Sequence, residues 1–224
     1  TAGTSGPIIN GGDVKNQGVE LGLSWNDQIG KDFTYSVGAN LAYNHNEVGS
    51  IPTEDGIIHG ATNQIYSNAE EFYRAENGHA IGYFWGFKTA GIFQNKQEIN
   101  DWIAAGNGVY QSSVQPGDVK YVDVNHDGVI DAKDKVDLGN GLPKYTFGFN
   151  INLGYKGFDL SLNATGAAGF QIAQSYRDPN SSQSNYSRQI LNRWTGEGTS
   201  NRIPRVTYGD VGNWQFSDLY LQDG

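Results

Sequence analysis

The chain of 224 residues contains no cysteine and no methionine, and it has only 6 prolines and 17% charged residues. Without cysteine there is no disulfide framework, and thiols say nothing about the compartment. No apolar run approaches the roughly 18 residues of a transmembrane helix, which excludes a helical span. The missing methionine at position 1 predicts a fragment or a processed piece of a longer protein.

The charge that is present is mostly acidic, with a net charge of −9 and a pI near 4.8. A nucleic-acid-binding protein would present a basic face, so this balance argues against nucleic acid as a partner. It fits a surface that meets cations or neutral polar ligands. The 31 glycines and the frequent aromatic residues favour strands and turns over helices. The length allows one large all-β domain or two small ones.

Four segments alternate between apolar and polar residues with a period of two, which predicts strands with one apolar and one polar face. Three of them are longer than the roughly 5–6 residues of a soluble strand and reach the 9–11 residues of a tilted membrane strand. Their polar faces carry Gly, Ser, Asn and Thr, and aromatic residues stand near their ends, as in outer-membrane barrels. A large soluble sandwich with a half-exposed sheet is the alternative. The segments are 19–25, 33–45, 145–155 and 158–170.

The connections differ sharply in length. Short turns near 27–32 and at Lys156-Gly157 alternate with long polar stretches at 46–143 and 171–213. Outer-membrane barrels show this asymmetry, with short periplasmic turns and long extracellular loops. The direction of the strands requires an even number of crossings between 33–45 and 145–155, so we expect the strand-like segment 80–93 to lie outside the membrane; the alternative is an unrecognised partner strand.

The long stretches also contain two segments with apolar residues at helical spacing. They are 95–105, which ends at Gly106, and 185–195, which ends at Gly196. Glycine is a common residue just after a helix, so both are predicted as short helices. Trp102 and Trp194 are expected to anchor them.

The most explicit chemical pattern is an acidic loop of twelve residues with the spacing of a calcium loop. Gly128 stands at position six, where the chain turns sharply, and the shorter Asp replaces Glu at position twelve. An acidic turn on a solvated loop without an ion is the alternative. The predicted ligands of a structural Ca²⁺ are Asp123, Asn125, Asp127, the carbonyl of Val129, Asp131 and Asp134.

No pattern of catalytic residues emerges, and we predict that the protein is not an enzyme. The four histidines (45, 59, 79 and 126) lack the spacing of a metal site. Phosphate loops and nucleophile elbows are missing from the sequence. The adjacent carboxylates Glu54-Asp55 and Glu70-Glu71 are interpreted as solvated loop charges.

Three segments (82–94, 116–131 and 138–150) resemble hallmark segments of the SusC/RagA family of TonB-linked outer-membrane transporters. The resemblance extends from about Asn16 to the end of the chain. The pair His79-Ala80 departs from the family pattern, which often has a proline-containing pair there. A second departure, Asn-Gly-Leu-Pro-Lys at 140–144, is confined to a turn.

The resemblance implies an all-β fold in which residues 1–224 form a late, partial section of a large antiparallel transmembrane β-barrel of about 22 strands with a plug. It implies the outer membrane of a Bacteroidetes-type bacterium. It also implies import of glycans or peptides with a SusD-like surface lipoprotein as lid, driven by TonB. The plug and the TonB box would lie upstream, and the last strands downstream.

Two other functions stay open at this point. One is a secreted calcium-dependent carbohydrate-binding or adhesive all-β module, and the other is a glycoside hydrolase. The hydrolase would need two carboxylates facing one cleft, and no pair fits that role. Solubility separates the transporter section from the secreted module, because a barrel section needs detergent or its missing strands.

Overall fold

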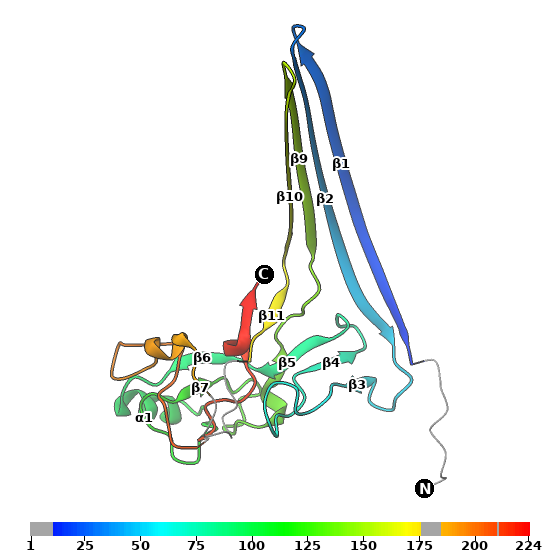
Figure 1. Ribbon diagram of the computed structural model, residues 1–224. Helices are drawn as coiled ribbons and strands as arrows, with labels where there is room; N and C mark the ends of the chain where they lie inside the picture. Colours follow the sequence, from blue (N-terminus) through cyan, green and yellow to red (C-terminus); the bar gives the residue numbers. More distant parts are fainter. Residues whose placement is uncertain (1–10, 176–184, 210) are drawn as a thin grey trace.

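The computed structural model describes residues 11–175, 185–209 and 211–224 and divides into a tall sheet and a folded assembly at one end of it (Figure 1). The sheet has four antiparallel strands in the order β1-β2-β9-β10. The strands are β1 (Asp13–Ile29), β2 (Phe33–Ser50), β9 (Tyr145–Tyr155) and β10 (Phe158–Ala168). All four predicted strands are therefore present in one sheet, which confirms the antiparallel section expected from the sequence.

The first two strands are longer than the alternating segments predicted. β1 has 17 residues and β2 has 18, and they pair from Ile29↔Phe33 up to Asp13↔Ser50. Beyond Val19 and Tyr43 the residues are polar on both faces except for the pair Val14↔Val48, so the alternation ends although the backbone ladder continues. Hydrogen bonding between strands needs only the backbone, so apolar alternation marks the membrane-like part of a strand and misses the rest.

The turns of both hairpins lie at the end of the sheet away from the folded assembly (Figure 1). β9 and β10 are joined by Lys156 and Gly157, whose φ angles are 48° and 85°. Positive φ at both central residues is the geometry of a type I′ turn, whose twist matches that of the strands. The short turns predicted from the sequence are thus confirmed.

One face of the sheet is apolar across all four strands. The register aligns Trp25, Val37, Ile151 and Leu162 in one row. Phe33 packs near Tyr155 at the turn end, with ring centroids 6.5 Å apart, and Tyr43 packs near Tyr145 at the other end, at 5.4 Å. About ten residues separate these aromatic rows, or roughly 34 Å along a strand. A tilt of about 40° reduces this to roughly 26 Å, the height of the apolar band of a membrane barrel.

This apolar face is not covered by any element of the described chain. Phe158 is 80% exposed, Leu21 57% and Leu162 53%. A soluble sandwich would bury such a face against a second sheet, and soluble proteins rarely expose so large an apolar patch. The sandwich interpretation is therefore wrong, and the face has the character of a wall that meets lipid.

The opposite face is polar, and its side chains lie close to the backbone of the sheet. Gly38 pairs with Asn150, and Asn40 pairs with Gly148. A Cβ atom at Gly38 would collide with Oδ1 of Asn150, and one at Gly148 would collide with Oδ1 of Asn40. Each asparagine therefore lies across the glycine of the neighbouring strand. Nearer the turns, Asn152 donates to Ser36 (3.1 Å) and accepts from Ser161 (2.8 Å).

β2 pairs directly with β9 over eleven residue pairs, so residues 51–144 leave the sheet and return to the adjacent position without crossing it. The segment 80–93 forms β5 (Tyr83–Phe87) and β6 (Thr89–Ile92), which belong to two small sheets outside the tall one. The expectation that it stands outside the barrel wall is confirmed.

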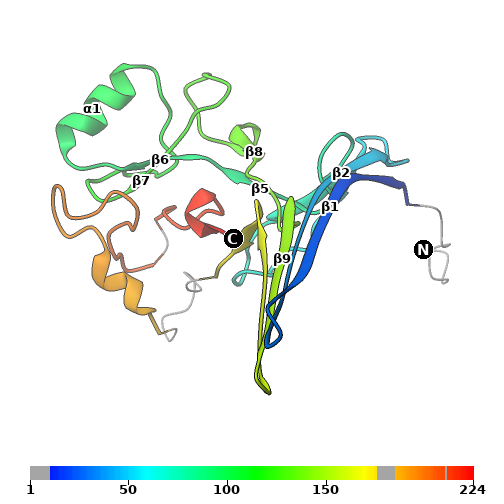
Figure 2. The same cartoon turned by 90° about the horizontal axis from the view of Figure 1, so that it is seen from above.

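The loop assembly, as we call residues 51–144 and 171–224, contains small sheets, short helices and two apolar clusters. Seen from above, it extends to one side of the tall sheet (Figure 2). Its further elements are β3 (Ile57–His59), β4 (Tyr73–Glu76), α1 (Lys96–Ala104), β7 (Val119–Tyr121), η1 (Ala132–Asp134), β8 (Lys135–Asp137), β11 (Gln171–Ala173), η2 (Arg188–Asn192), η3 (Asp218–Tyr220) and β12 (Leu221–Asp223). None of the helices in the described residues is both long and apolar enough to cross a bilayer.

The two clusters hold together residues from distant parts of the chain. The first consists of Phe87, Ile92, Val119, Tyr121 and Ile130, with Trp194 and Leu219 packed against it. The second is centred on Phe216, Tyr220 and Leu221 and includes Phe72 and Phe84. Each cluster joins the insertion after β2 to the insertion after β10. The two long stretches therefore fold as one unit.

The helix predicted at 95–105 is confirmed as α1. Asn95 caps it by accepting from the N–H of Glu98 (2.9 Å), and Glu98 accepts in return from the N–H of Gln94 (2.5 Å). Gly106, with φ of 87°, follows its end. Trp102 donates to the carbonyl of Gly108 (3.0 Å), so it anchors the helix as expected.

The helix predicted at 185–195 is wrong in extent, because only the short 3-10 helix η2 forms there. The N–H of Trp194 donates to the carbonyl of Ile203 (2.8 Å), and its indole donates to Gln94 (3.3 Å). These tertiary bonds replace the helical ones, which is why the apolar spacing overpredicts the helix. Trp194 is nonetheless an anchor, as predicted.

We expect spin labels on the two faces of the sheet to report different environments in the membrane-inserted full-length protein. Labels at Leu41 and Ile151 should be quenched by a lipid-soluble agent. Labels at Asn40 and Asn150 should respond to a water-soluble agent, because these side chains lie on the polar face. Power-saturation EPR provides the measurement, and equal quenching of both faces would contradict the assignment of the faces.

Candidate functional site

The acidic loop has the backbone conformation that its sequence predicts. Gly128 has φ of 83°, in the region that favours glycine. Its N–H donates to Oδ2 of Asp123 (2.8 Å), and the N–H of Asp127 donates to Oδ1 of Asn125 (3.0 Å). The N–H of Val129 donates to Oδ1 of Asp127 (2.9 Å). Successive turns of this kind wrap the chain around the Asp123 carboxylate.

The last two predicted ligands act mainly as backbone caps. Asp134 is fully buried, and its Oδ1 accepts from the N–H of Val124 (2.8 Å) and, at 3.4 Å, from that of Asn125. Its Oδ2 accepts from the N–H of Asp131 (2.8 Å), and the two residues form a capping box on η1. In the part of the chain that the structure describes, no three acidic or histidine side chains converge to hold a metal ion. Calcium binding therefore stays a prediction.

The buried carboxylate of Asp123 is kept ionised by the loop around it. Loss of water is the largest single influence, and it raises the pKa. Backbone N–H groups of Gly128, His126, Asp127 and Gly108 together outweigh it and lower the pKa below its ordinary value. Asp123 therefore stabilises the loop at neutral pH, and this contribution is lost as the pH falls through the lowered pKa.

A buried polar network centred on Asp118 links the two long insertions. Asp118 is fully buried and forms an ion pair with Arg205, with Nε and Oδ1 2.7 Å apart. Asn213 donates to the same oxygen (2.8 Å) and accepts from the N–H of Val119 (3.0 Å). Gln111 donates to Asn213 (3.0 Å). No motif in the sequence indicated this network, because its members lie roughly 90 residues apart.

A second polar cluster surrounds His59 on the hairpin of β3 and β4. Its ring contacts Glu71 (2.9 Å) and Asp55 (3.3 Å), and Glu71 also pairs with Arg74. Glu70 pairs with Lys135. Glu54, Asp55 and Glu70 are exposed, as the interpretation of solvated loop charges has it. That interpretation is wrong for Glu71, which is mostly buried and pairs with both His59 and Arg74.

The protonation of His59 follows from this arrangement. Hydrogen bonding to Glu71, and then to Asp55, raises the pKa of His59 above its ordinary value. The pKa of Glu71 is lowered in the same cluster. Burial alone would raise this pKa, but His59 and Arg74 together outweigh the effect of burial. The ion pairs of this cluster therefore connect the two strands of the hairpin.

Curated relatives match from 69% to 100% of the chain, and all of them are much longer than it. The chain is 27% identical over 225 residues to "TonB-dependent receptor P3" of Formosa agariphila, which covers 100% of the chain and 22% of that protein. It is 26% identical over 159 residues to "TonB-dependent receptor SusC" of Bacteroides thetaiotaomicron, covering 69% of the chain and 14% of that protein. The chain thus spans 22% of the length of the first of these relatives and 14% of the second. No protein-family model matches it.

Two solved structures share the fold. They are described as the RagAB peptide importer in the "open-open" state and the RagAB peptide transporter. The TM-scores are 0.61 and 0.62 at 18% and 19% identity, and each match covers 95% of the chain and 21% of the solved chain. The comparisons confirm the resemblance to the SusC/RagA family, the partial barrel section and the location in the outer membrane of a Bacteroidetes-type bacterium.

We expect Asp118→Ala to loosen the loop assembly strongly. Removing the buried partner of Arg205 should cost about 3–5 kcal/mol, because Arg205 and Asn213 lose the acceptor they share. Limited proteolysis and hydrogen exchange of residues 108–121 and 203–214 would measure it. The matched control is Asp32→Ala, which removes an exposed pair with Lys156 (3.8 Å) and should cost no more than about 1 kcal/mol. Equal effects of both variants would contradict the role of the network.

We expect the hairpin of β3 and β4 to open more readily as the pH rises. The raised pKa means that protonated His59 stabilises the hairpin fully below its unfolded pKa of about 6.5. This contribution is lost as the pH rises through the folded pKa. Hydrogen exchange at Ile58, relative to its intrinsic rate at each pH, should show the trend, and His59→Gln should remove it. His45→Gln, on β2, is the control and should leave it unchanged.

Proposed function

We propose that this section of a SusC/RagA-like outer-membrane barrel belongs to a TonB-dependent transporter that imports a glycan through the outer membrane. A SusD-like surface lipoprotein serves as the lid, and TonB acts on a part of the protein outside this chain. The observation that supports it best is the tall sheet, with an uncovered apolar face, a polar face and all of its large insertions at one end. A secreted module would have buried the apolar face.

The open edges of the sheet support a larger barrel. β1 and β10 each pair with a neighbour on one side only among the described strands. In a bilayer the unpaired N–H and C=O groups of an edge strand would cost several kcal/mol each, so barrels close on themselves. The four strands therefore act as part of a closed wall, with the polar face toward the lumen and the plug.

The loop assembly is the part that meets ligand and lid in this proposal. Short turns face the periplasm in barrels of this kind, and long insertions face outward. The turns at 30–32 and 156–157 would then be periplasmic, and residues 51–144 and 171–224 would lie at the cell surface. Peptide is the alternative cargo, since RagAB is described as a peptide importer.

The experiment combines topology with uptake in cells that produce the full-length protein. This chain has no cysteine, so single cysteines can be introduced at Glu54 in the loop assembly and at Lys31 in a turn. A membrane-impermeant thiol reagent should label Glu54→Cys in intact cells and Lys31→Cys only after lysis. Deletion of the gene should abolish uptake of one glycan. Labelling of Lys31→Cys from outside, or unchanged uptake of glycans, would refute the proposal. The loop site near Ser181 lies outside the described residues.

We further propose that the acidic loop binds one Ca²⁺ in a structural role, through Asp123, Asn125, Asp127, the carbonyl of Val129, Asp131 and Asp134. The spacing of these residues and the positive φ of Gly128 support it. The two positive charges of the ion would offset half of the negative charge of the four carboxylates and so reduce their mutual repulsion.

Calcium should therefore stabilise the loop by about 2.7 kcal/mol at a concentration a hundred times its dissociation constant. Isothermal titration of the calcium-depleted full-length protein would measure binding. Asp127→Ala should abolish the heat of binding, whereas Asp101→Asn, an exposed acid on α1, should not. Titration without heat, at a loop that is equally stable with and without calcium, would refute the calcium site.

A further inference from the structure

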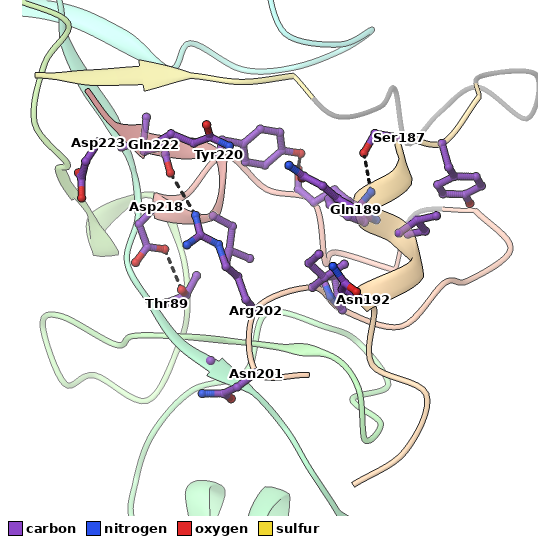
Figure 3. A pocket seen from close by; sticks show the side chains of 18 of the residues that line it. Thr89, Ser187, Gln189, Asn192, Asn201, Arg202, Asp218, Tyr220, Gln222 and Asp223 are labelled. Carbon is purple, nitrogen blue, oxygen red and sulfur yellow. Dashed lines mark hydrogen bonds between the residues drawn. The ribbon is translucent and has the colours of Figure 1, made fainter. Parts of the chain in front are cut away.

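A cavity of about 820 Å³ lies in the loop assembly where β12, η2 and residues 201–204 meet (Figure 3). Its volume is within the range of roughly 300–1,000 Å³ typical of small-molecule sites. The walls come from both insertions, since Thr89 and Gly91 of β6 face residues after position 171. The cavity is therefore formed only when the two insertions fold together.

Arg202 and Asp218 give this cavity opposite charges in one place (Figure 3). The guanidinium of Arg202 donates to the carbonyl of Leu221 (3.3 Å), and among the described residues it forms no ion pair. Asp218 accepts from the hydroxyl of Thr89 through Oδ1 (2.7 Å), which leaves Oδ2 available. A ligand group in this place meets a strong donor and a strong acceptor together.

The rest of the polar lining consists mostly of side-chain amides, each of which carries both a donor and an acceptor. Tyr186 and Trp214 add aromatic surface. Arg202, Asp218 and Asp223 sum to a formal charge of −1, which does not favour an anionic ligand. The amides are those of Gln171, Gln189, Asn192, Asn201 and Gln222.

Such a lining fits hydroxyl groups better than a peptide backbone. A hydroxyl donates and accepts at the same atom, and sugar rings also present C–H faces to aromatic side chains. An extended peptide would instead add to a strand edge. The carbonyl of Leu221 on β12 already accepts from Arg202 (3.3 Å), so this acceptor is engaged and does not favour an added peptide strand.

We propose that this cavity binds a neutral sugar unit of the glycan ligand, with Arg202 and Asp218 holding adjacent hydroxyls. The proposal rests on the transport function proposed above and assigns it a ligand class and a site. The Thr89 hydroxyl and the Leu221 carbonyl hold the two charged side chains in place before the sugar arrives. The site is therefore largely pre-formed.

The test uses the full-length protein in detergent and isothermal titration with maltohexaose, cellohexaose, laminarihexaose, mannohexaose and xylohexaose, and with a pool of random octapeptides. At least one hexasaccharide should bind. Arg202→Ala should weaken it about tenfold to a hundredfold, as expected for one charged hydrogen bond. Asn192→Ala, an exposed change in η2, should weaken it less and provides a second variant should Arg202→Ala misfold. Arg188→Ala is the matched control, because it removes the same charge just outside the cavity and should leave affinity unchanged.

Each other outcome overturns the assignment. Hexasaccharide binding that is equal in wild type, Arg202→Ala and Asn192→Ala would place the sugar elsewhere. Peptides that bind and lose affinity in these variants would make the cavity a peptide site, and no binding of any probe would leave it without a ligand of the proposed class. Uptake separates the two proposals: glycan import that is normal in Arg202→Ala cells refutes only the cavity, whereas normal import in the deletion strain refutes the transport function.

Discussion

The direct pairing of β2 with β9 is the constraint on which the rest of the structure depends. It places the start of β9 at Tyr145 beside Tyr43 of β2, so the chain that leaves the wall after β2 returns to it on the adjacent strand. Closing a long loop costs an entropy that grows only slowly with its length, so a large insertion is tolerated once its ends are fixed. The eleven residue pairs between β2 and β9 fix them, and the insertion is then free to fold on its own.

The insertion after β10 is held in a similar way by β11 and β12, which pair antiparallel through Gln171↔Asp223. The two insertions then share the clusters around Phe87 and Phe216 and the network around Asp118. The cavity beside Arg202 depends on both, because its walls are contributed by each. The stability of the loop assembly and the shape of the candidate binding site thus depend on the same contacts.

The sequence predicted the wall well and the loop assembly poorly, for a physical reason. In a strand with one apolar and one polar face, apolar and polar residues alternate along the sequence. The strands at 145–155 and 33–45 could therefore be predicted without knowing which strands pair with them. No periodic pattern in the sequence marks Asp118, Arg205 and Asn213 as partners, because they come into contact only when distant segments of the chain fold together. The same holds for His59, whose partners Asp55 and Glu71 looked like surface charges, and for 185–195, where Trp194 bonds to Ile203 instead of continuing a helix.

The asparagines that lie across glycines on the polar face have a consequence for how this wall changes in evolution. A larger residue at Gly38 would require Asn150 to turn aside, and one at Gly148 would require Asn40 to do so. A substitution at either glycine is therefore coupled to its own asparagine. Within each pair, a larger residue at the glycine should be accompanied by a smaller one at the asparagine.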